Sequence, residues 1–228
     1  MRMVFAVIVY CVYAAFCWKV VFHFLLWHRA AADLESTQTR RYKSPSKVWL
    51  QAAADVVFFR RLFKENGLLW ISAWVFHISF FFVVVRHLRY FMDPVPRCVT
   101  GLQGLGLISG YVLPVSILSI ALVRLTGKER YVSRLNYFIL GLVFLVGITG
   151  LMLHIFRTDL VGVKEFVLGF FTFSPHPVPH SLLFIVHFLL VLLLILSLPF
   201  HIFIAPVIMY EARKREVQLQ EVLHEKKK

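Results

Sequence analysis

Four of the ten histidines lie inside long apolar runs, where an ionisable side chain is unexpected. His77 and His87 lie in WVFHISFFFVVVRHLRYF, and His187 and His201 lie in VHFLLVLLLILSLPFHIF. Neutral imidazole is a common metal ligand, and ionisable side chains at membrane depth generally face the interior of a helix bundle. These four histidines are therefore candidate ligands of metal-containing groups held between helices.

Five membrane-spanning helices are predicted to position these histidines. The chain has 228 residues, of which 59% are hydrophobic and 23 are phenylalanines, a composition far more apolar than that of a soluble domain. A membrane-spanning helix needs about 20 mostly apolar residues. We predict an all-α integral membrane bundle in a single domain, residues 1–228, with residues 206–228 as a charged tail. The five spans are residues 4–27, 68–88, 102–123, 135–156 and 181–205.

The first apolar run is predicted to be a true span rather than a signal peptide. Lys19 is followed by further apolar residues, and no small-residue cleavage site follows it. Cys11 and Cys17 lie in this run and Cys98 stands alone, so the sequence shows neither a disulfide framework nor paired metal-ligand spacing. It also has no CxxCH, which argues against covalently attached c-type haem.

The positive charge is predicted to set the orientation of the bundle. The net charge is +13, and most Lys and Arg residues lie between the first and second spans, between the third and fourth, and in the tail. By the positive-inside rule these segments are cytoplasmic and the N-terminus is outside. We therefore expect a multi-pass protein of the cytoplasmic membrane, in contact with lipid and without a nucleic-acid partner. The basic residues of the two loops are Arg29, Arg40, Arg41, Lys43, Lys47, Arg60, Arg61, Lys64, Arg124, Lys128, Arg130 and Arg134.

Two segments outside the spans are also predicted to be helical. Residues 48–67 alternate apolar and basic side chains and predict a cytoplasmic surface helix, which either lies in the lipid headgroups or docks a partner subunit. Residues 157–180 are apolar but broken by glycines and prolines, so they cannot span the membrane. We expect a short helix at 162–172 and a proline-rich return on the outer face, where they can cover a site.

The third span carries four closely spaced glycines. Gly101, Gly104, Gly106 and Gly110 would let a neighbouring helix or a flat cofactor approach the backbone closely. Tight helix packing without a cofactor is the commoner outcome of such a pattern.

The predicted orientation sorts the four histidines into two pairs by depth. His77 and His201 fall toward the cytoplasmic side, and His87 and His187 toward the outer side. Along the second span His77 and His87 are separated by roughly 15 Å, and along the fifth His187 and His201 by roughly 21 Å. Helix tilt of about 20° and the breadth of a porphyrin partly absorb this difference. Imidazoles on opposite faces of a porphyrin give a six-coordinate haem suited to electron transfer. The pattern favours two stacked haem groups.

Structural hydrogen bonding or a proton path is the alternative role for these histidines. A proton-pumping relay would be expected to include acids within the spans. The spans carry almost none, and the nearby acids Asp55, Asp93, Asp159 and Glu165 lie outside them.

Several motifs resemble one known family over nearly the whole chain. These are FHI and RHL in the second span, VHFLLVLLLILSLPFHIFIAPVIMYEARKR in the fifth, and VRLTGKERYVSRLNYF before the fourth. The pattern resembles the gamma subunit of respiratory nitrate reductase, a five-helix dihaem cytochrome b. It is similar too to the cytochrome b subunits of membrane-bound heterodisulfide reductase and of sulfite-reduction electron-transfer complexes.

The resemblance implies a quinol-oxidising subunit with two haem b groups. It implies that His77 and His201 bind an inner haem iron and that His87 and His187 bind an outer one. A quinol, expected to be menaquinol, would give up electrons at the outer haem. A cytoplasmic iron–sulfur subunit would pass them to a catalytic reductase subunit. His87, Arg97 and His154 are the expected catalytic residues of the quinol site. Further candidates are Gln103, His176 and His180.

One departure from the family concerns the last ligand. In the nitrate reductase members the final histidine lies about one helical turn farther beyond the LPF motif, at the position of Ala205, whereas here His201 follows Phe200 directly. A one-turn deletion would align His201 with the family ligand. Without that deletion His201 is one turn out of register.

Two other functional classes remain open from the sequence. A haem-free membrane anchor would keep the five spans and the basic loops. A proton-coupled transporter subunit is disfavoured because the chain lacks intramembrane acids and an internal repeat.

Overall fold

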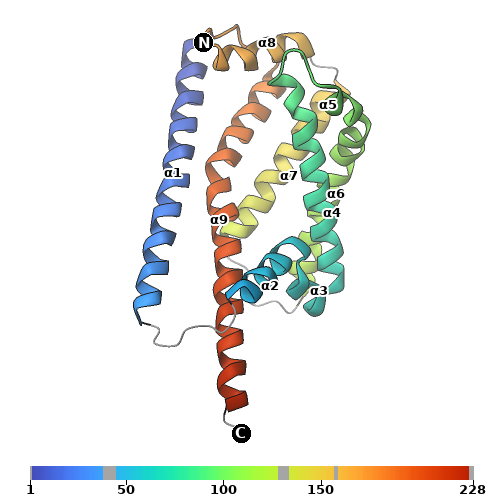
Figure 1. The fold of residues 1–228 in the computed structure, drawn as a ribbon. Helices are drawn as coiled ribbons and strands as arrows, with labels where there is room; N and C mark the ends of the chain where they lie inside the picture. Colours follow the sequence, from blue (N-terminus) through green and yellow to red (C-terminus); the bar gives the residue numbers. More distant parts are fainter. Residues whose placement is uncertain (1, 38–44, 128–133, 157–158, 226–228) are drawn as a thin grey trace. The chain divides into compact units, whose positions relative to one another are not determined.

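The structure is a computed structural model that describes residues 2–37, 45–127, 134–156 and 159–225 (Figure 1). Regular secondary structure in these residues is entirely helical, and five of the helices are long and apolar enough to cross a membrane. The predicted all-α fold with five spans is confirmed, whereas the orientation of the termini stays a prediction. The long helices are α1 (Arg2–Thr37), α4 (Gly67–His87), α6 (Gln103–Thr126), α7 (Arg134–Ile155) and α9 (Leu182–Glu225).

The candidate membrane-spanning portions lie close to the predicted spans. They are Arg2–Leu26, Gly67–Tyr90, Gln103–Thr126, Arg134–Ile155 and Leu182–Pro199. Some of the basic residues on which the predicted orientation depends lie outside the described residues. These are Arg40, Arg41, Lys43, Lys128 and Arg130.

Shorter helices connect the long ones. Residues 48–67 form two helices rather than one, because Phe59 has a left-handed backbone with φ of 47° that ends the first helix. The helix predicted at 162–172 is present, and the Asp159 side chain caps it by accepting bonds from the backbone of Val161 and Gly162. The short helices are α2 (Pro45–Phe58), α3 (Arg60–Glu65), η1 (Leu88–Tyr90), α5 (Arg97–Gly101) and α8 (Leu160–Phe171).

The described chain forms two compact units. Unit 1 contains Met1–Ala14 and Leu68–Leu196, and unit 2 contains Ala15–Gly67 and Ser197–Lys228. Helices α1 and α9 each run through both units. The single domain stays a prediction, and each unit is described by itself below.

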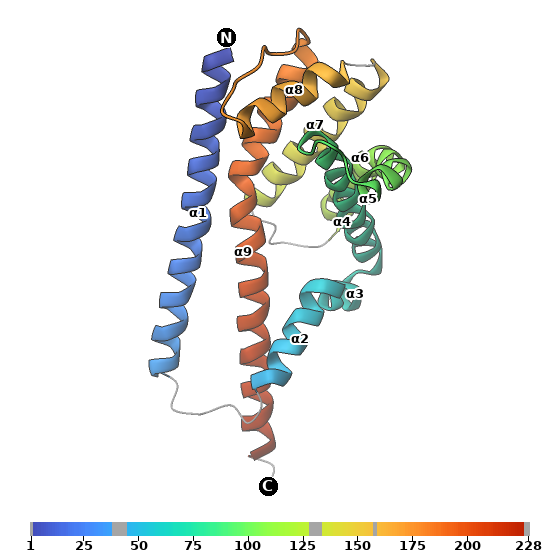
Figure 2. The ribbon, with the colours of Figure 1, turned by 45° about the horizontal axis from the view of Figure 1, so that its top comes forward.

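An aromatic core holds α8 in place within unit 1. Phe166 of α8 is 1% exposed and packs edge-on against Phe170, Phe184 and Phe188. The hydroxyl of Tyr10 on α1 donates a hydrogen bond to the Phe170 carbonyl at 3.0 Å. Figure 2 shows α8 beside the first turns of α1 and α9. The helix predicted to cover a site is thus anchored by buried aromatic side chains, whose burial is a main source of packing energy.

Close helix packing in unit 1 depends on one of the four predicted glycines. A Cβ built on Gly106 would lie 2.6 Å from Cβ of Arg86 and 3.1 Å from the Phe82 carbonyl oxygen. Gly106 therefore lets α6 approach the backbone of α4. Cβ atoms built on Gly101, Gly104 and Gly110 would meet nothing within 4 Å, so these three glycines are not needed for this contact.

A buried ion-pair cluster joins three helices of unit 2. Asp55 on α2 is 1% exposed and accepts two hydrogen bonds from the guanidinium of Arg213 on α9, the one from Nε at 2.9 Å. Arg61 on α3 lies 3.7 Å from the same carboxylate oxygen and 2.9 Å from Glu216. Because a buried carboxylate needs paired charges to be stable, this cluster fixes α2 and α3 against α9.

Candidate functional site

The structure brings together the two histidines that were predicted to form the outer pair. His87 is the last residue of α4, and His187 lies in the second turn of α9; both belong to unit 1. Their ring centroids are 6.5 Å apart, and the ring planes are inclined by 25°. The sequence predicted similar depths for these residues, and the helix packing supplies the missing fact that they face each other.

Hydrogen bonds at Nδ1 decide which nitrogen of each ring is available to bind a metal ion. Nδ1 of His87 lies 2.7 Å from the Val83 carbonyl oxygen. A carbonyl only accepts, so Nδ1 carries the proton and Nε2 keeps its lone pair. Metal-binding histidines commonly have this arrangement. One ring nitrogen donates its N–H to a carbonyl oxygen, which fixes the tautomer and the ring orientation, and the other nitrogen binds the metal.

A threonine fixes the tautomer and ring orientation of His187. The Thr149 hydroxyl on α7 donates to the Leu145 carbonyl at 2.7 Å, and its oxygen lies 2.9 Å from Nδ1 of His187. Since the hydroxyl proton is engaged with Leu145, the oxygen accepts the Nδ1 proton of His187. Nε2 of His187 therefore also keeps its lone pair.

Gly150 gives the His187 ring the space to take this position. A Cβ built on Gly150 would lie 3.0 Å from Cε1 and 3.6 Å from Nδ1 of His187. Thr149 and Gly150 of α7 thus hold this imidazole in position. Neither was among the predicted site residues, although the small residues of GITG inside an apolar span could have indicated a place where a neighbouring side chain packs closely.

The His87–His187 pair fits a haem iron. Two imidazoles that would share one metal ion, each with its ligand nitrogen about 2 Å from the metal, would have ring centres up to roughly 6 Å apart. The observed separation of 6.5 Å is close to that distance, and the Nδ1 bonds leave Nε2 of both rings to act as ligand atoms. No group of three or more His, Cys, Asp or Glu residues suited to a metal ion occurs among the described residues, so a cofactor that brings its own equatorial ligands is the better match.

The predicted inner pair is divided between the two units. Nδ1 of His77 lies 2.7 Å from the Ala73 carbonyl oxygen, and since a carbonyl only accepts, Nδ1 carries the proton as in His87. His77 belongs to unit 1 and His201 to unit 2. Their pairing, and the proposed one-turn deletion before His201, stay predictions.

The predicted quinol-site residues do not gather around one cavity. Arg97 begins α5 and is exposed, and His154 is exposed in the last turn of α7. Neither lines either of the two cavities described below. For His87, a bond to iron would engage both ring nitrogens, so its predicted roles as ligand and as proton acceptor exclude each other.

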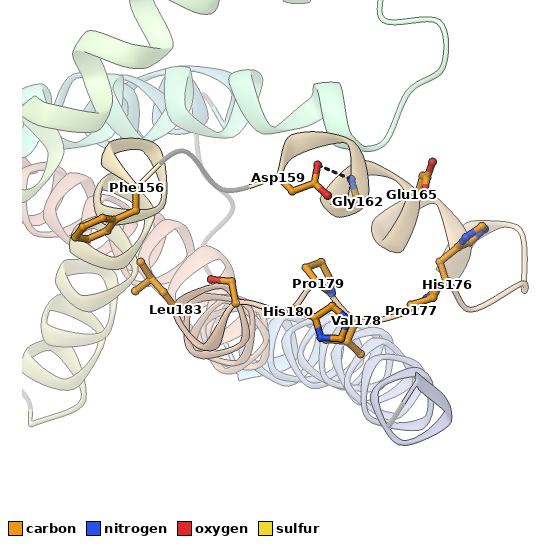
Figure 3. Close-up of a pocket in the computed structure, with 11 residues that line it drawn as sticks. Phe156, Asp159, Gly162, Glu165, His176, Pro177, Val178, Pro179, His180 and Leu183 are labelled. Carbon is orange, nitrogen blue, oxygen red and sulfur yellow. Dashed lines mark hydrogen bonds between the residues drawn. The ribbon is translucent and has the colours of Figure 1, made fainter.

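The first cavity lies between α8 and the proline-rich return that follows it (Figure 3). Its volume is about 700 Å³, and its wall includes the predicted candidates His176 and His180. Leu183, one helical turn before His187, closes part of its apolar side. The remaining lining residues are Phe156, Asp159, Gly162, Glu165, Pro177, Val178, Pro179 and Ser181.

The second cavity lies beside the His87 end of the site. It measures about 490 Å³ and contains the predicted candidate Gln103 together with Arg89 and Tyr90. The Tyr90 ring centroid is 5.9 Å from that of His87. The remaining lining residues are Asp93, Val95, Leu160, Val161, Lys164, Glu165 and Leu168.

Five apolar helices with a facing histidine pair in the membrane-spanning part define the class of membrane cytochrome b-like proteins. The chain is 30% identical to the Hdr-like menaquinol oxidoreductase cytochrome b-like subunit of Archaeoglobus profundus, over 86% of this chain and 73% of the relative. It is 27% identical to the protein of the same description from Archaeoglobus fulgidus, over 86% of this chain and 74% of the relative. The chain belongs to this family of Hdr-like cytochrome b-like subunits, as the resemblance in its motifs predicted. No family model matches the chain, and no solved structure matches it.

Proposed function

We propose that this chain is the dihaem cytochrome b subunit of a membrane-bound menaquinol oxidoreductase. The observation that carries the proposal is the His87–His187 pair, with ring centroids 6.5 Å apart and both Nε2 atoms available. The relatives' description as menaquinol oxidoreductase subunits supports the choice of substrate. Menaquinol is oxidised near this pair, on the side of the membrane that carries the N-terminus.

The chain's own residues hold and orient the cofactors. His87 and His187 bind one haem iron through Nε2, while Val83 and Thr149 fix the two ring orientations. His77 and His201 bind the second haem. A haem with two imidazole ligands supplies one-electron transfer and leaves no coordination site for substrate.

Electron transfer across the membrane gives this arrangement an energetic role. Quinol releases its protons at the outer face, and its electrons pass inward to a cytoplasmic iron–sulfur subunit. Moving one elementary charge across the membrane corresponds to about 2.3 kcal/mol per 100 mV. The subunit thus conserves energy in the cytoplasmic membrane, and a separate catalytic reductase subunit performs the terminal reaction.

The proposal is tested by the absorption spectrum and haem content of the purified protein. We expect a b-type spectrum, two haems per chain, and reduction of the haems by a water-soluble naphthoquinol. His87→Ala and His187→Ala should each remove one haem, whereas His224→Ala in the tail should retain both.

A folded, helical protein without haem would contradict the proposal and favour a haem-free anchor. If His87→Ala and His187→Ala both retain two haems, these histidines are not a ligand pair. Coupled uptake of a solute by liposomes containing the haem-free protein would favour the transporter.

A further inference from the structure

Two cavities of unit 1 share one acidic side chain. Glu165 on α8 lines the 490 Å³ cavity beside His87 and also the 700 Å³ cavity under the proline-rich return. Building on the proposed function, we propose that Glu165 accepts the protons of quinol oxidation and that His176 and His180 carry them toward water.

The smaller cavity has the chemistry to hold the quinol head group. Its volume lies within the roughly 300–1,000 Å³ range of ligand pockets, and Gln103 and Arg89 supply polar groups. Nε of Arg89 is buried and has no hydrogen-bond partner within the described part of the chain. A buried donor of this kind is stabilised by a ligand oxygen. The guanidinium is held by a bond to the Tyr90 hydroxyl at 2.6 Å and lies 4.7 Å from the centre of that ring.

The other acidic side chains that line the two cavities are already engaged. Asp93 forms an ion pair with Lys164 at 2.8 Å. Asp159 caps α8, accepting bonds from the backbone nitrogens of Val161 and Gly162 at 3.0 Å and 3.2 Å. Arginine remains protonated and cannot accept, which excludes Arg89.

Glu165 differs from these acids. It is exposed, it lines both cavities, and it makes no ion pair or side-chain hydrogen bond with any residue that the structure describes. A carboxylate that none of these residues engages can take a proton from a quinol hydroxyl.

The larger cavity offers the next acceptors. His176 and His180 line this cavity and belong to the return that Figure 3 draws beside α8. Imidazole exchanges protons near neutral pH. Gly169 places the return against α8, because a Cβ there would lie 2.6 Å from the Ser174 carbonyl oxygen and 2.8 Å from Cδ2 of His176.

The proposed sequence balances protons and electrons. Oxidation of one quinol to quinone breaks two O–H bonds and releases two electrons and two protons. The electrons leave one at a time to the one-electron acceptor held by His87 and His187. Each proton passes to Glu165, then to His176 or His180, and then to water, so Glu165 is used twice per quinol.

The test compares Glu165→Gln with the wild-type holoprotein during reduction by a water-soluble naphthoquinol. We expect the haems of Glu165→Gln to be reduced about 100-fold more slowly, at the lower end of the range for loss of a general base, with quinone affinity and haem spectrum unchanged. Infrared difference spectra should show a carboxylic acid band during turnover that the variant lacks.

The matched control is Asp159→Asn in the larger cavity. Asparagine also caps helices well, so this variant removes a neighbouring charge while it keeps α8, and it should retain the wild-type rate and infrared band. The double variant His176→Gln/His180→Gln should delay the appearance of protons in the medium, followed with a pH-indicator dye, with little change in the first haem reduction.

The outcomes separate the two proposals. A wild-type protein that the naphthoquinol does not reduce would overturn the proposed function. A wild-type protein that is reduced, with Glu165→Gln equal to it in rate and infrared band, would overturn the role of Glu165 and leave the proposed function standing. Undelayed proton release in the double variant would exclude the two histidines as carriers.

Discussion

The hydroxyl of Thr149 links two helices through a single ring nitrogen. It accepts the Nδ1 proton of His187 while donating to the Leu145 carbonyl. His87 needs no such partner from another helix, because its own helix supplies the Val83 carbonyl. The two imidazoles of one site are therefore oriented by different means, and only the orientation of His187 depends on a side chain of another helix.

Removal of this hydroxyl is expected to weaken cofactor retention. Thr149→Val keeps the side-chain shape but removes the hydroxyl oxygen that accepts the Nδ1 proton of His187. Loss of such a supporting partner typically costs about 10- to 100-fold in metal affinity, and we expect a similar loss in haem affinity, measured by titration of the apoprotein with haem. Thr149→Ser should retain wild-type affinity. Equal affinities for the valine and serine variants would show that the hydroxyl does not orient the ligand.

Gly150 offers a second test at the same ring. Gly150→Ala places a methyl group 3.0 Å from Cε1 of His187, so the imidazole must shift by a few tenths of an ångström. We expect altered absorption and electron paramagnetic resonance spectra of one haem. Gly141→Ala on the same helix meets nothing within 4 Å and should leave both spectra unchanged. It should also stabilise α7 by up to about 1 kcal/mol through helix propensity. Identical spectra for Gly150→Ala and wild type would contradict the predicted contact.

At the scale of the elements, helices are held by a few specific contacts outside the apolar spans. In unit 1, α8 is anchored by Phe166 and by the Tyr10 hydroxyl. In unit 2, α2 and α3 are joined to α9 through Asp55 and its arginine partners. The residues predicted as one surface helix thus contain a buried anchor as well as exposed apolar side chains such as Trp49 and Phe63.

Substitution of the buried carboxylate should loosen unit 2. Asp55→Ala leaves Arg213 and Arg61 without their buried partner, while the exposed Glu216 still pairs with both. Removal of one member of a buried ion pair costs about 3–5 kcal/mol, and we expect the lower end because both arginines are partly exposed. The expected result is a lower unfolding temperature and faster protease cleavage near α2. Glu65→Gln, an exposed acid on α3, should change neither. An unchanged unfolding temperature in Asp55→Ala would show that the cluster contributes little.

At the scale of the whole molecule, the charge distribution predicts which side of the membrane each segment occupies. Cys98 is exposed on α5, in a segment predicted to lie outside, whereas the tail is predicted to be cytoplasmic. In intact cells a membrane-impermeant maleimide should label Cys98. A cysteine introduced by Gln220→Cys in a Cys98→Ser background should be labelled only after the membrane is permeabilised. The reverse pattern would invert the predicted topology and move quinol oxidation to the cytoplasmic side.

The sequence by itself determined the five spans and the helix near 162–172, and it predicted that His87 and His187 lie at similar depths. It could do so because lipid allows only backbone whose hydrogen bonds are satisfied internally, which makes span length and composition sufficient for these features. It did not show that Phe59 divides the surface helix or that Asp55 is buried. It also missed Thr149 and Gly150. These features depend on contacts between residues far apart in the chain, such as Thr149 with His187 and Asp55 with Arg213. Only the tertiary structure decides such contacts, because the rotation of each helix about its axis is set by packing against its neighbours.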